Sequence, residues 1–76
     1  MDKYEASTSS IERAIEIKGG VKKLAQSIGV SYQTVLNWKN GRFFVSAINC
    51  QKIEHTTGGM VKKEEILPDY PWEDFK

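Results

Sequence analysis

Residues 21 to 40 restrict the folds open to this chain more than any other segment. Apolar side chains in the first half of the segment follow the spacing i, i+3, i+4 and i+7, which places them on one face of a two-turn helix. They are Val21, Leu24, Ala25 and Ile28. Gly29 follows, and glycine readily adopts the left-handed conformation in which many helices end. The pattern predicts a helix over 21–28 that stops at a tight turn.

A second helix, over 32–39, is predicted directly after this turn. Ser31 can cap it by accepting a hydrogen bond from the free N–H groups of its first turn. Val35 and Trp38 supply its inward face. A small residue where two helices cross, here Ala25, followed four residues later by glycine, is typical of the helix-turn-helix of DNA-binding proteins. An unrelated helical hairpin is the alternative, because such hairpins also carry Ala and Gly at about this spacing.

The composition indicates one small globular domain, 1–76. A chain of 76 residues has room for one modest hydrophobic core. No apolar run approaches the roughly 20 residues of a membrane span, and the N-terminus does not have the pattern of a signal peptide. Cys50 is the only cysteine, so neither a disulfide framework nor a cysteine zinc site is available. We expect a cytoplasmic protein that does not contact membranes.

The formal net charge of +1 hides an uneven distribution. Between positions 13 and 42 the only acidic residue is Glu16, and the segments before and after are each net acidic. The basic residues of this stretch are Arg13, Lys18, Lys22, Lys23, Lys39 and Arg42. Positive charge concentrated in this way favours binding to the DNA phosphate backbone, although a solvated helix face would also be rich in lysine.

One further helix is predicted before the helix-turn-helix. Residues 1–8 are polar and have no clear period, so we expect them to be flexible. Ser9 and Glu12 form a capping box, which predicts that the helix begins after Ser9. A start near Tyr4 is also compatible with the pattern, since Tyr4 and Ile11 share a helical face. The Gly-Gly pair after residue 18 ends the helix.

The second half of the chain predicts two more helices and a tail. Ser46 can cap a helix over 47–55, in which Ile48 and Ile53 are the expected core contacts. A fifth helix, over 63–67, is limited by the proline that follows it. With no strand pattern, the predicted fold class is all-α.

These residues resemble the Cro-type repressors of temperate phages, and among them the YdaS-like branch of Cro and antitoxin-like regulators. The resemblance covers residues 19–69. The part that helix-turn-helix repressors share consists of Gly19-Gly20-Val21, Leu24-Ala25, Ile28-Gly29-Val30-Ser31, Val35, Trp38 and Gly41-Arg42. The part more specific to this branch includes Ile53-Glu54, Thr57-Gly58-Gly59 and Leu67-Pro68-Asp69.

The resemblance implies a five-helix, lambda-repressor-like domain that binds operator DNA, usually as a dimer. Its implied function is that of a transcriptional repressor, which occupies an operator and blocks RNA polymerase. Two alternatives stay open: an antitoxin-like regulator whose acidic aromatic tail binds a partner protein, and an interaction module that has lost DNA binding. A steep loss of affinity with salt would separate the DNA binders from the last class.

The helix over 32–39 is expected to enter the major groove with its N-terminal end first. The residues expected to contact bases are Tyr32, Gln33, Leu36 and Asn37. Gln33 and Asn37 can each pair bidentately with adenine, and Leu36 can touch a thymine methyl group. The alternative for the two amides is simple exposure to solvent. Trp38 is expected to lie in the core rather than to stack on a base.

Phosphate contacts are expected at the ends of the two helices of the motif. The candidates are Lys22, Ser31, Lys39, Asn40 and Arg42. Lys22 lies at the start of its helix, where free N–H groups also favour an anion. Lys39, Asn40 and Arg42 lie where the recognition helix leaves the groove.

A homodimer is expected, because a single helix-turn-helix reads only a few base pairs and a two-fold dimer adds a second half-site. The candidate interface residues are Phe43, Phe44, Tyr70, Trp72 and Phe75. Of the two adjacent phenylalanines, we expect one in the core and the other at the interface. The tail aromatics either pack on a second subunit or fold back on their own domain, which would leave a monomer that dimerises on DNA.

Nothing in the sequence favours an enzyme. Cys50 and His55 are five residues apart and do not share a helical face, and no acidic cluster has the spacing of metal ligands. The Gly58-Gly59 pair lacks the context of a phosphate-binding loop. We therefore expect no catalytic residue, cofactor, metal or small-molecule ligand.

Overall fold

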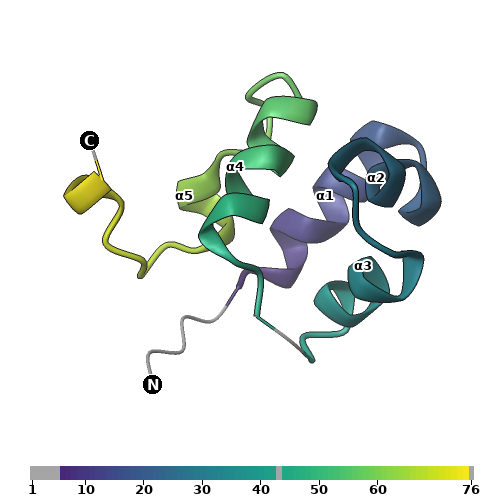
Figure 1. The fold of residues 1–76 in the computed structure, drawn as a ribbon, viewed down its shortest axis with the longest axis horizontal. Helices are drawn as coiled ribbons and strands as arrows, with labels where there is room; N and C mark the ends of the chain where they lie inside the picture. The colour runs from purple at the N-terminus through teal and green to yellow at the C-terminus, as the bar shows by residue number, and fades with distance from the viewer. Residues whose placement is uncertain (1–5, 43, 76) are drawn as a thin grey trace.

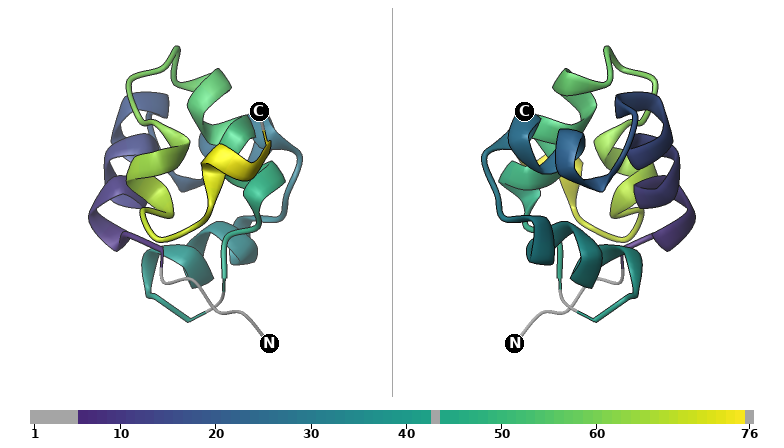
Figure 2. Two further views of the ribbon diagram at one scale, coloured as in Figure 1. Left: turned by 90° about the vertical axis from the view of Figure 1, so that its left-hand side faces the viewer. Right: turned by 90° about the vertical axis from the view of Figure 1, so that its right-hand side faces the viewer.

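The computed structural model describes residues 6–42 and 44–75 of the chain. Within these ranges it is all-helical, which confirms the predicted fold class (Figure 1). The elements are α1 (Thr8–Lys18), α2 (Val21–Ile28), α3 (Tyr32–Lys39), α4 (Ala47–Thr56), α5 (Lys63–Ile66) and a 3-10 turn, η1 (Trp72–Phe75). In both views of Figure 2, α3 lies at the lower edge of the molecule, and the loop between α4 and α5 lies at the top.

The helix-turn-helix has the bounds that the sequence predicts. Gly29 has a φ of 78°, in the left-handed region, and its N–H donates to the carbonyl oxygen of Ala25 at 2.9 Å. Val30 packs against the core from within the turn. Oγ of Ser31 then accepts a hydrogen bond from the N–H of Thr34 at 3.0 Å, so Ser31 caps α3. The expected roles of the glycine and the serine are confirmed.

The start of α1 differs from the prediction. Its N-cap is Ser7 rather than Ser9, because Oγ of Ser7 accepts from the N–H of Ser10 at 3.2 Å. The N–H of Ser7 also donates to the carbonyl oxygen of Ile66 at 2.8 Å, which fixes the residue against α5. Residues 6 and 7 are not helical, so a helix running on from Tyr4 is excluded. Ser7 and Thr8, which the sequence analysis assigned to a flexible segment, are the N-cap and the first residue of α1.

In α4, one of the two expected core contacts is wrong. Ile53 is fully buried, whereas Ile48 is 64% exposed. Cys50 lies one turn before Ile53 on the same helical face and takes the inward position instead. Ser46 caps the helix as expected, since its Oγ accepts from the N–H of Asn49 at 3.1 Å. The fifth helix is shorter by one residue than predicted and ends at Ile66.

The helix-turn-helix packs on the rest of the domain through a single hydrophobic core. Ala25 is 3% exposed where α2 lies against α3, which allows the close approach that its small side chain suggests. Leu24 and Val35 are fully buried beside it. Trp38 is 2% exposed, so it is a core residue as predicted and not a surface available for stacking on a base.

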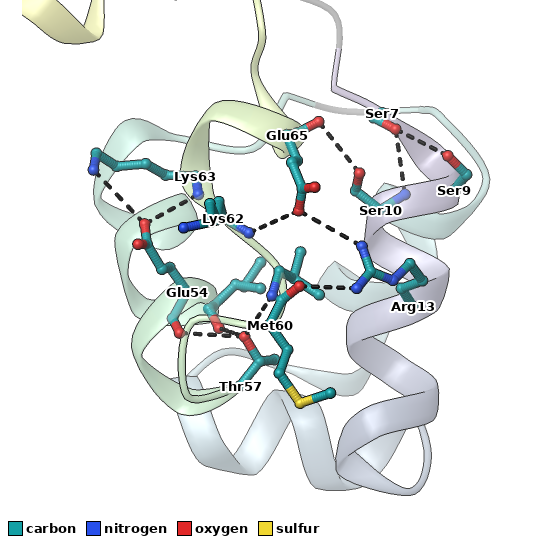
Figure 3. Close-up of polar contacts among 12 residues, drawn as sticks. Ser7, Ser9, Ser10, Arg13, Glu54, Thr57, Met60, Lys62, Lys63 and Glu65 are labelled. Carbon is teal, nitrogen blue, oxygen red and sulfur yellow. Dashed lines mark hydrogen bonds and ion pairs between the residues drawn. The ribbon is translucent and has the colours of Figure 1, made fainter.

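Thr57 organises the loop between α4 and α5 (Figure 3). The side chain is buried, its Oγ1 donates to the carbonyl oxygen of Ile53 at 2.9 Å, and it accepts from the N–H of Val61 at 3.2 Å. One hydroxyl group therefore satisfies backbone groups on both sides of the loop. Buried backbone groups left without a partner would be costly, so this threonine fixes the path of the chain into α5.

A second set of polar contacts joins α5 to α1 (Figure 3). Nη2 of Arg13 donates to the carbonyl oxygen of Met60 at 2.9 Å, and Nη1 lies 3.6 Å from Oε1 of Glu65. Oγ of Ser10 donates to the carbonyl oxygen of Glu65 at 3.2 Å. These bonds hold the C-terminal part of the domain against the first helix, on the side of the molecule away from α3.

The aromatic tail folds back on its own domain, one of the two arrangements that the sequence leaves open. Trp72 is 9% exposed, and its Nε1 donates to the carbonyl oxygen of Leu67 at 2.8 Å. The rings of Tyr70 and Trp72 have centroids 4.6 Å apart. Nζ of Lys63, on α5, lies 5.6 Å from the centroid of the Trp72 ring.

Candidate nucleic-acid interface

The outward face of α3 follows from its inward one. Burial of Val35 and Trp38 fixes the rotation of the helix, and the four predicted base contacts fall outside that stripe. Tyr32 and Gln33 are exposed, and Leu36 and Asn37 are half-buried. Tyr32 is 53% exposed, a large fraction for an aromatic ring in so small a domain. The structure thus brings the four residues together on one short helix, with the two at its N-terminal end standing out most.

Gln33 and Asn37 are hydrogen-bonded to each other. Nε2 of Gln33 donates to Oδ1 of Asn37 at 3.1 Å, across one turn of α3. Both side chains carry a donor and an acceptor in one plane, the arrangement that recognises the edge of a base in the major groove. The i, i+4 spacing of the two amides is visible in the sequence and favours such a bond, although the sequence analysis did not use it.

Thr34 is a residue of this surface that the sequence analysis missed. Its Oγ1 lies 2.8 Å from Oγ of Ser31, and either hydroxyl can be the donor. When Thr34 donates, the proton of Ser31 is available to a phosphate oxygen, while its lone pair still caps α3. Ser31 is exposed, as a phosphate contact requires. Two hydroxyl residues three apart at a helix start are the signal that could have revealed the pair.

The predicted phosphate-binding cations flank this face. Lys22, Lys39 and Arg42 are exposed, and so is Asn40. Lys22 lies in the first turn of α2. The N-cap residue of this helix is Gly20, which has no side chain to accept a hydrogen bond from the N–H groups of the first turn. Free backbone N–H groups at a helix start and a nearby ammonium group both attract anions. The chemistry at this helix start therefore suits a phosphate.

Two of the six basic residues that the sequence places in this region serve the fold instead. Arg13 binds Met60 and Glu65 on the far side of α1, and Nζ of Lys18 donates to the carbonyl oxygen of Thr56 at 3.4 Å. The other four are exposed on or beside α2 and α3: Lys22, Lys23, Lys39 and Arg42. Four of the six cations are therefore available to bind phosphates.

The predicted interface residues are only partly available as a surface. Phe44 is 52% exposed. Trp72 is buried in its own core, which leaves little of its side chain for an interface, and Tyr70 is half-buried beside it. Phe43 and the side chain of Phe75 lie outside the described residues. Ile48, which the sequence analysis placed in the core, is exposed in the first turn of α4, four residues after Phe44 in the chain.

The two residues considered for chemistry lie apart from this face. Cys50 is fully buried, and burial raises the pKa of its thiol to about 12, so it stays protonated and poorly nucleophilic at neutral pH. His55 is exposed near the end of α4. Within residues 6–42 and 44–75, no three His, Cys, Asp or Glu side chains lie close enough together to hold a metal ion. In the same ranges, no helix has the length and apolar character needed to cross a membrane.

Comparison with known proteins identifies the family of this chain. Residues 11–75 match the family described as "Bacterial toxin YdaS". The chain is 36% identical over 63 residues to the "Putative transcriptional regulator YdaS" of Escherichia coli (strain K12), which covers 83% of this chain and 64% of that protein. It is 33% identical over 55 residues to the "Regulatory protein cro" of Pseudomonas phage D3, covering 72% of this chain and 75% of that protein.

The chain thus spans a little under two thirds of the length of the Escherichia coli relative. No solved structure matches it. The match over residues 11–75 includes every described helix except the first turn of α1, and both relatives exceed 30% identity. The resemblance seen in the sequence is confirmed, and the chain belongs to the YdaS family.

Proposed function

We propose that this chain is an operator-binding transcriptional repressor whose α3 lies in the major groove of double-stranded DNA. The observation that carries the proposal is the polar face of α3. Tyr32 and Gln33 are exposed at its N-terminal end, and Gln33 lies on the side of the helix opposite the buried Val35 and Trp38. A helix held rigidly from behind, with planar amides in front, is suited to reading base edges.

The names of the relatives support a regulatory role. One is named a transcriptional regulator and the other a regulatory protein, cro. In this reading Tyr32, Gln33, Leu36 and Asn37 contact bases. The backbone of the DNA is held by Lys22, Ser31, Lys39, Asn40 and Arg42. As a repressor of this kind, the protein acts in the cytoplasm, where its DNA is.

Selection of bound sequences from random duplexes tests the proposal. The expected result is a short preferred sequence, with affinity that falls steeply between low and moderate salt. Lys39→Ala should weaken binding to all sequences alike and flatten the salt dependence by about one unit of slope. Lys62→Ala is the matched control, because Lys62 is exposed at the start of α5, which packs against α4 and α1. Its loss should leave the slope unchanged. Salt-insensitive binding, or none, would contradict the proposal.

We further infer that the repressor acts as a homodimer. The dimer forms either in free solution or when two copies bind to the same DNA. A two-fold dimer presents two recognition helices about one helical turn of DNA (~34 Å) apart. Phe44 is an exposed member of the proposed interface, and the exposed Ile48 is added to it. Tyr70 contributes only what its half-buried ring leaves exposed.

Sedimentation of the free protein and of its complex with a palindromic duplex tests this inference. Phe44→Ala with Ile48→Ala should shift dimer to monomer and weaken binding to the palindrome more than to a single half-site. Met60→Ala is the control, since Met60 is 59% exposed in the loop between α4 and α5. A wild-type monomer that occupies each half-site independently and at full affinity would contradict a dimer.

A further inference from the structure

The hydrogen bond between Gln33 and Asn37 limits what each amide can offer to a base. Gln33 is exposed and has the longer side chain, with more rotatable bonds, whereas Asn37 is half-buried. Nε2 of Gln33 donates to Oδ1 of Asn37. The half-buried Asn37 side chain therefore holds the more mobile side chain of Gln33. Without this bond, binding to DNA would have to order the Gln33 side chain and would lose conformational entropy in doing so.

The bond also determines which atoms remain for DNA. On Gln33 it leaves Oε1 and the second proton of Nε2, an acceptor beside a donor, which match N6 and N7 of adenine. On Asn37 it occupies one of the two lone pairs of Oδ1 and leaves both protons of Nδ2 available. Those protons match acceptors at a base edge, which are N7 of a purine, O6 of guanine and O4 of thymine.

We propose that Gln33 and Asn37 read DNA as one unit. In this unit Asn37 positions the amide of Gln33 against an adenine and donates its own amide protons to an acceptor on a neighbouring base pair. The inference rests on the proposed function, and it differs from two independent contacts to adenine. Loss of Asn37 then affects two base-pair positions, whereas loss of Gln33 affects only one.

Sequence selection with wild type, Gln33→Ala and Asn37→Ala tests this asymmetry. Alanine is a good helix former, and neither side chain is in the core, so both variants should fold and show the thermal unfolding of the wild type. Gln33→Ala should abolish the preference for adenine at one position. Asn37→Ala should relax that same position and the neighbouring one. If Asn37→Ala left the adenine preference as sharp as in wild type, the inference would be wrong, while the proposed function would stand.

A double-mutant cycle measures the coupling between Gln33 and Asn37 in DNA binding. It compares the affinities of the wild type, the two single variants and the double variant for the selected duplex. The double variant should bind about tenfold better than the product of the two single losses predicts, because each single change already removes part of the unit. The control cycle pairs Gln33→Ala with Lys22→Ala, on a different helix. That cycle should be multiplicative within about twofold. Equal coupling in both cycles, or none in the first, would contradict a shared reading unit.

The side-chain amide signals of Gln33 in the free protein provide a test that needs no DNA. In the wild type, the Nε2 proton that bonds to Asn37 should differ in chemical shift and exchange from its partner proton. Asn37→Ala should move both toward the signals of Gln51, an exposed glutamine on α4. Unchanged Gln33 signals would overturn the inference whatever the DNA data show. A wild type with no sequence preference would overturn both the inference and the proposed function.

Discussion

The indole of Trp72 donates to the carbonyl oxygen of Leu67 at 2.8 Å, in a buried site five residues earlier in the chain. This bond closes the tail back onto the end of α5. It also explains why a segment rich in proline and acid packs against its own domain. The apolar ring fills the core, and the single polar atom of the ring is satisfied by the backbone.

Removing this hydrogen bond should lower stability without changing the fold. Trp72→Phe keeps much of the apolar ring but removes one of the two hydrogen bonds to the carbonyl oxygen of Leu67, which still accepts from the N–H of Tyr70 at 3.2 Å. The loss of one such bond should cost about 0.5–1.5 kcal/mol. Urea denaturation measures the change in the free energy of unfolding. Tyr32→Phe is the control, because Tyr32 is exposed and loses only a surface hydroxyl group. A Trp72→Phe variant as stable as the control would show that the bond contributes little.

Trp38→Ala should destabilise the domain by about 3–5 kcal/mol, because it leaves a cavity behind the recognition helix. A domain of this size has a total stability on the order of 5 kcal/mol, so much of the variant should be unfolded at room temperature. Circular dichroism and urea denaturation measure this. Trp38→Phe, which fills more of the site, should be affected less. A folded Trp38→Ala protein that lost only DNA affinity would point to a base contact instead.

Gly29→Ala isolates the conformational cost of the turn. The φ of Gly29 is 78°, and a Cβ atom there would meet no other atom within 4 Å. The substitution therefore introduces backbone strain without a steric clash, and should cost about 1–2 kcal/mol. Gly29→Asn should cost less, since asparagine tolerates the left-handed region better. Equal stability of all three proteins in thermal denaturation would contradict the assigned strain.

Cys50 should react with an alkylating reagent only when the domain unfolds. Burial raises the pKa of its thiol to about 12 in the folded state, above the usual value, so the neutral thiol is the form that the fold favours. The resulting stability is fully present below the pKa of the unfolded thiol and is lost as the pH rises toward 12. At pH 8 the alkylation rate should rise sharply with urea through the unfolding transition. Fast labelling of the native protein would show that the site opens locally.

The elements of the helix-turn-helix were predictable because each depends on neighbours in the sequence. Gly29 ends α2 and Ser31 caps α3 through bonds that reach no more than four residues. The error at Ile48 has a different origin. The apolar residues of α4 are few, so the sequence does not fix which face turns inward. The packing of α4 against α2 and α5 settles it in favour of Cys50 and Ile53.

The sequence patterns could not predict contacts between residues far apart in the chain. Arg13 resembled a DNA-binding cation by charge alone, yet it binds Glu65, far along the chain. Ser7 caps α1 in place of Ser9, and its N–H is held by the carbonyl oxygen of Ile66. The candidate reading residues, in contrast, followed from the rotation of one helix, which Val35 and Trp38 define locally.

The contacts between α1 and α5 have a consequence for the moment at which the protein becomes active during synthesis. Ser10 bonds to a carbonyl oxygen 55 residues later in the chain, and Ser7 bonds to Ile66. During synthesis, α1 therefore obtains this partner only after α2, α3 and α4 have been made. Until then the helix-turn-helix lacks the support of α5. A nascent chain should therefore acquire a stable α3 surface only after α5 has been made, so products that stop before α5 would not compete for the DNA proposed as its ligand.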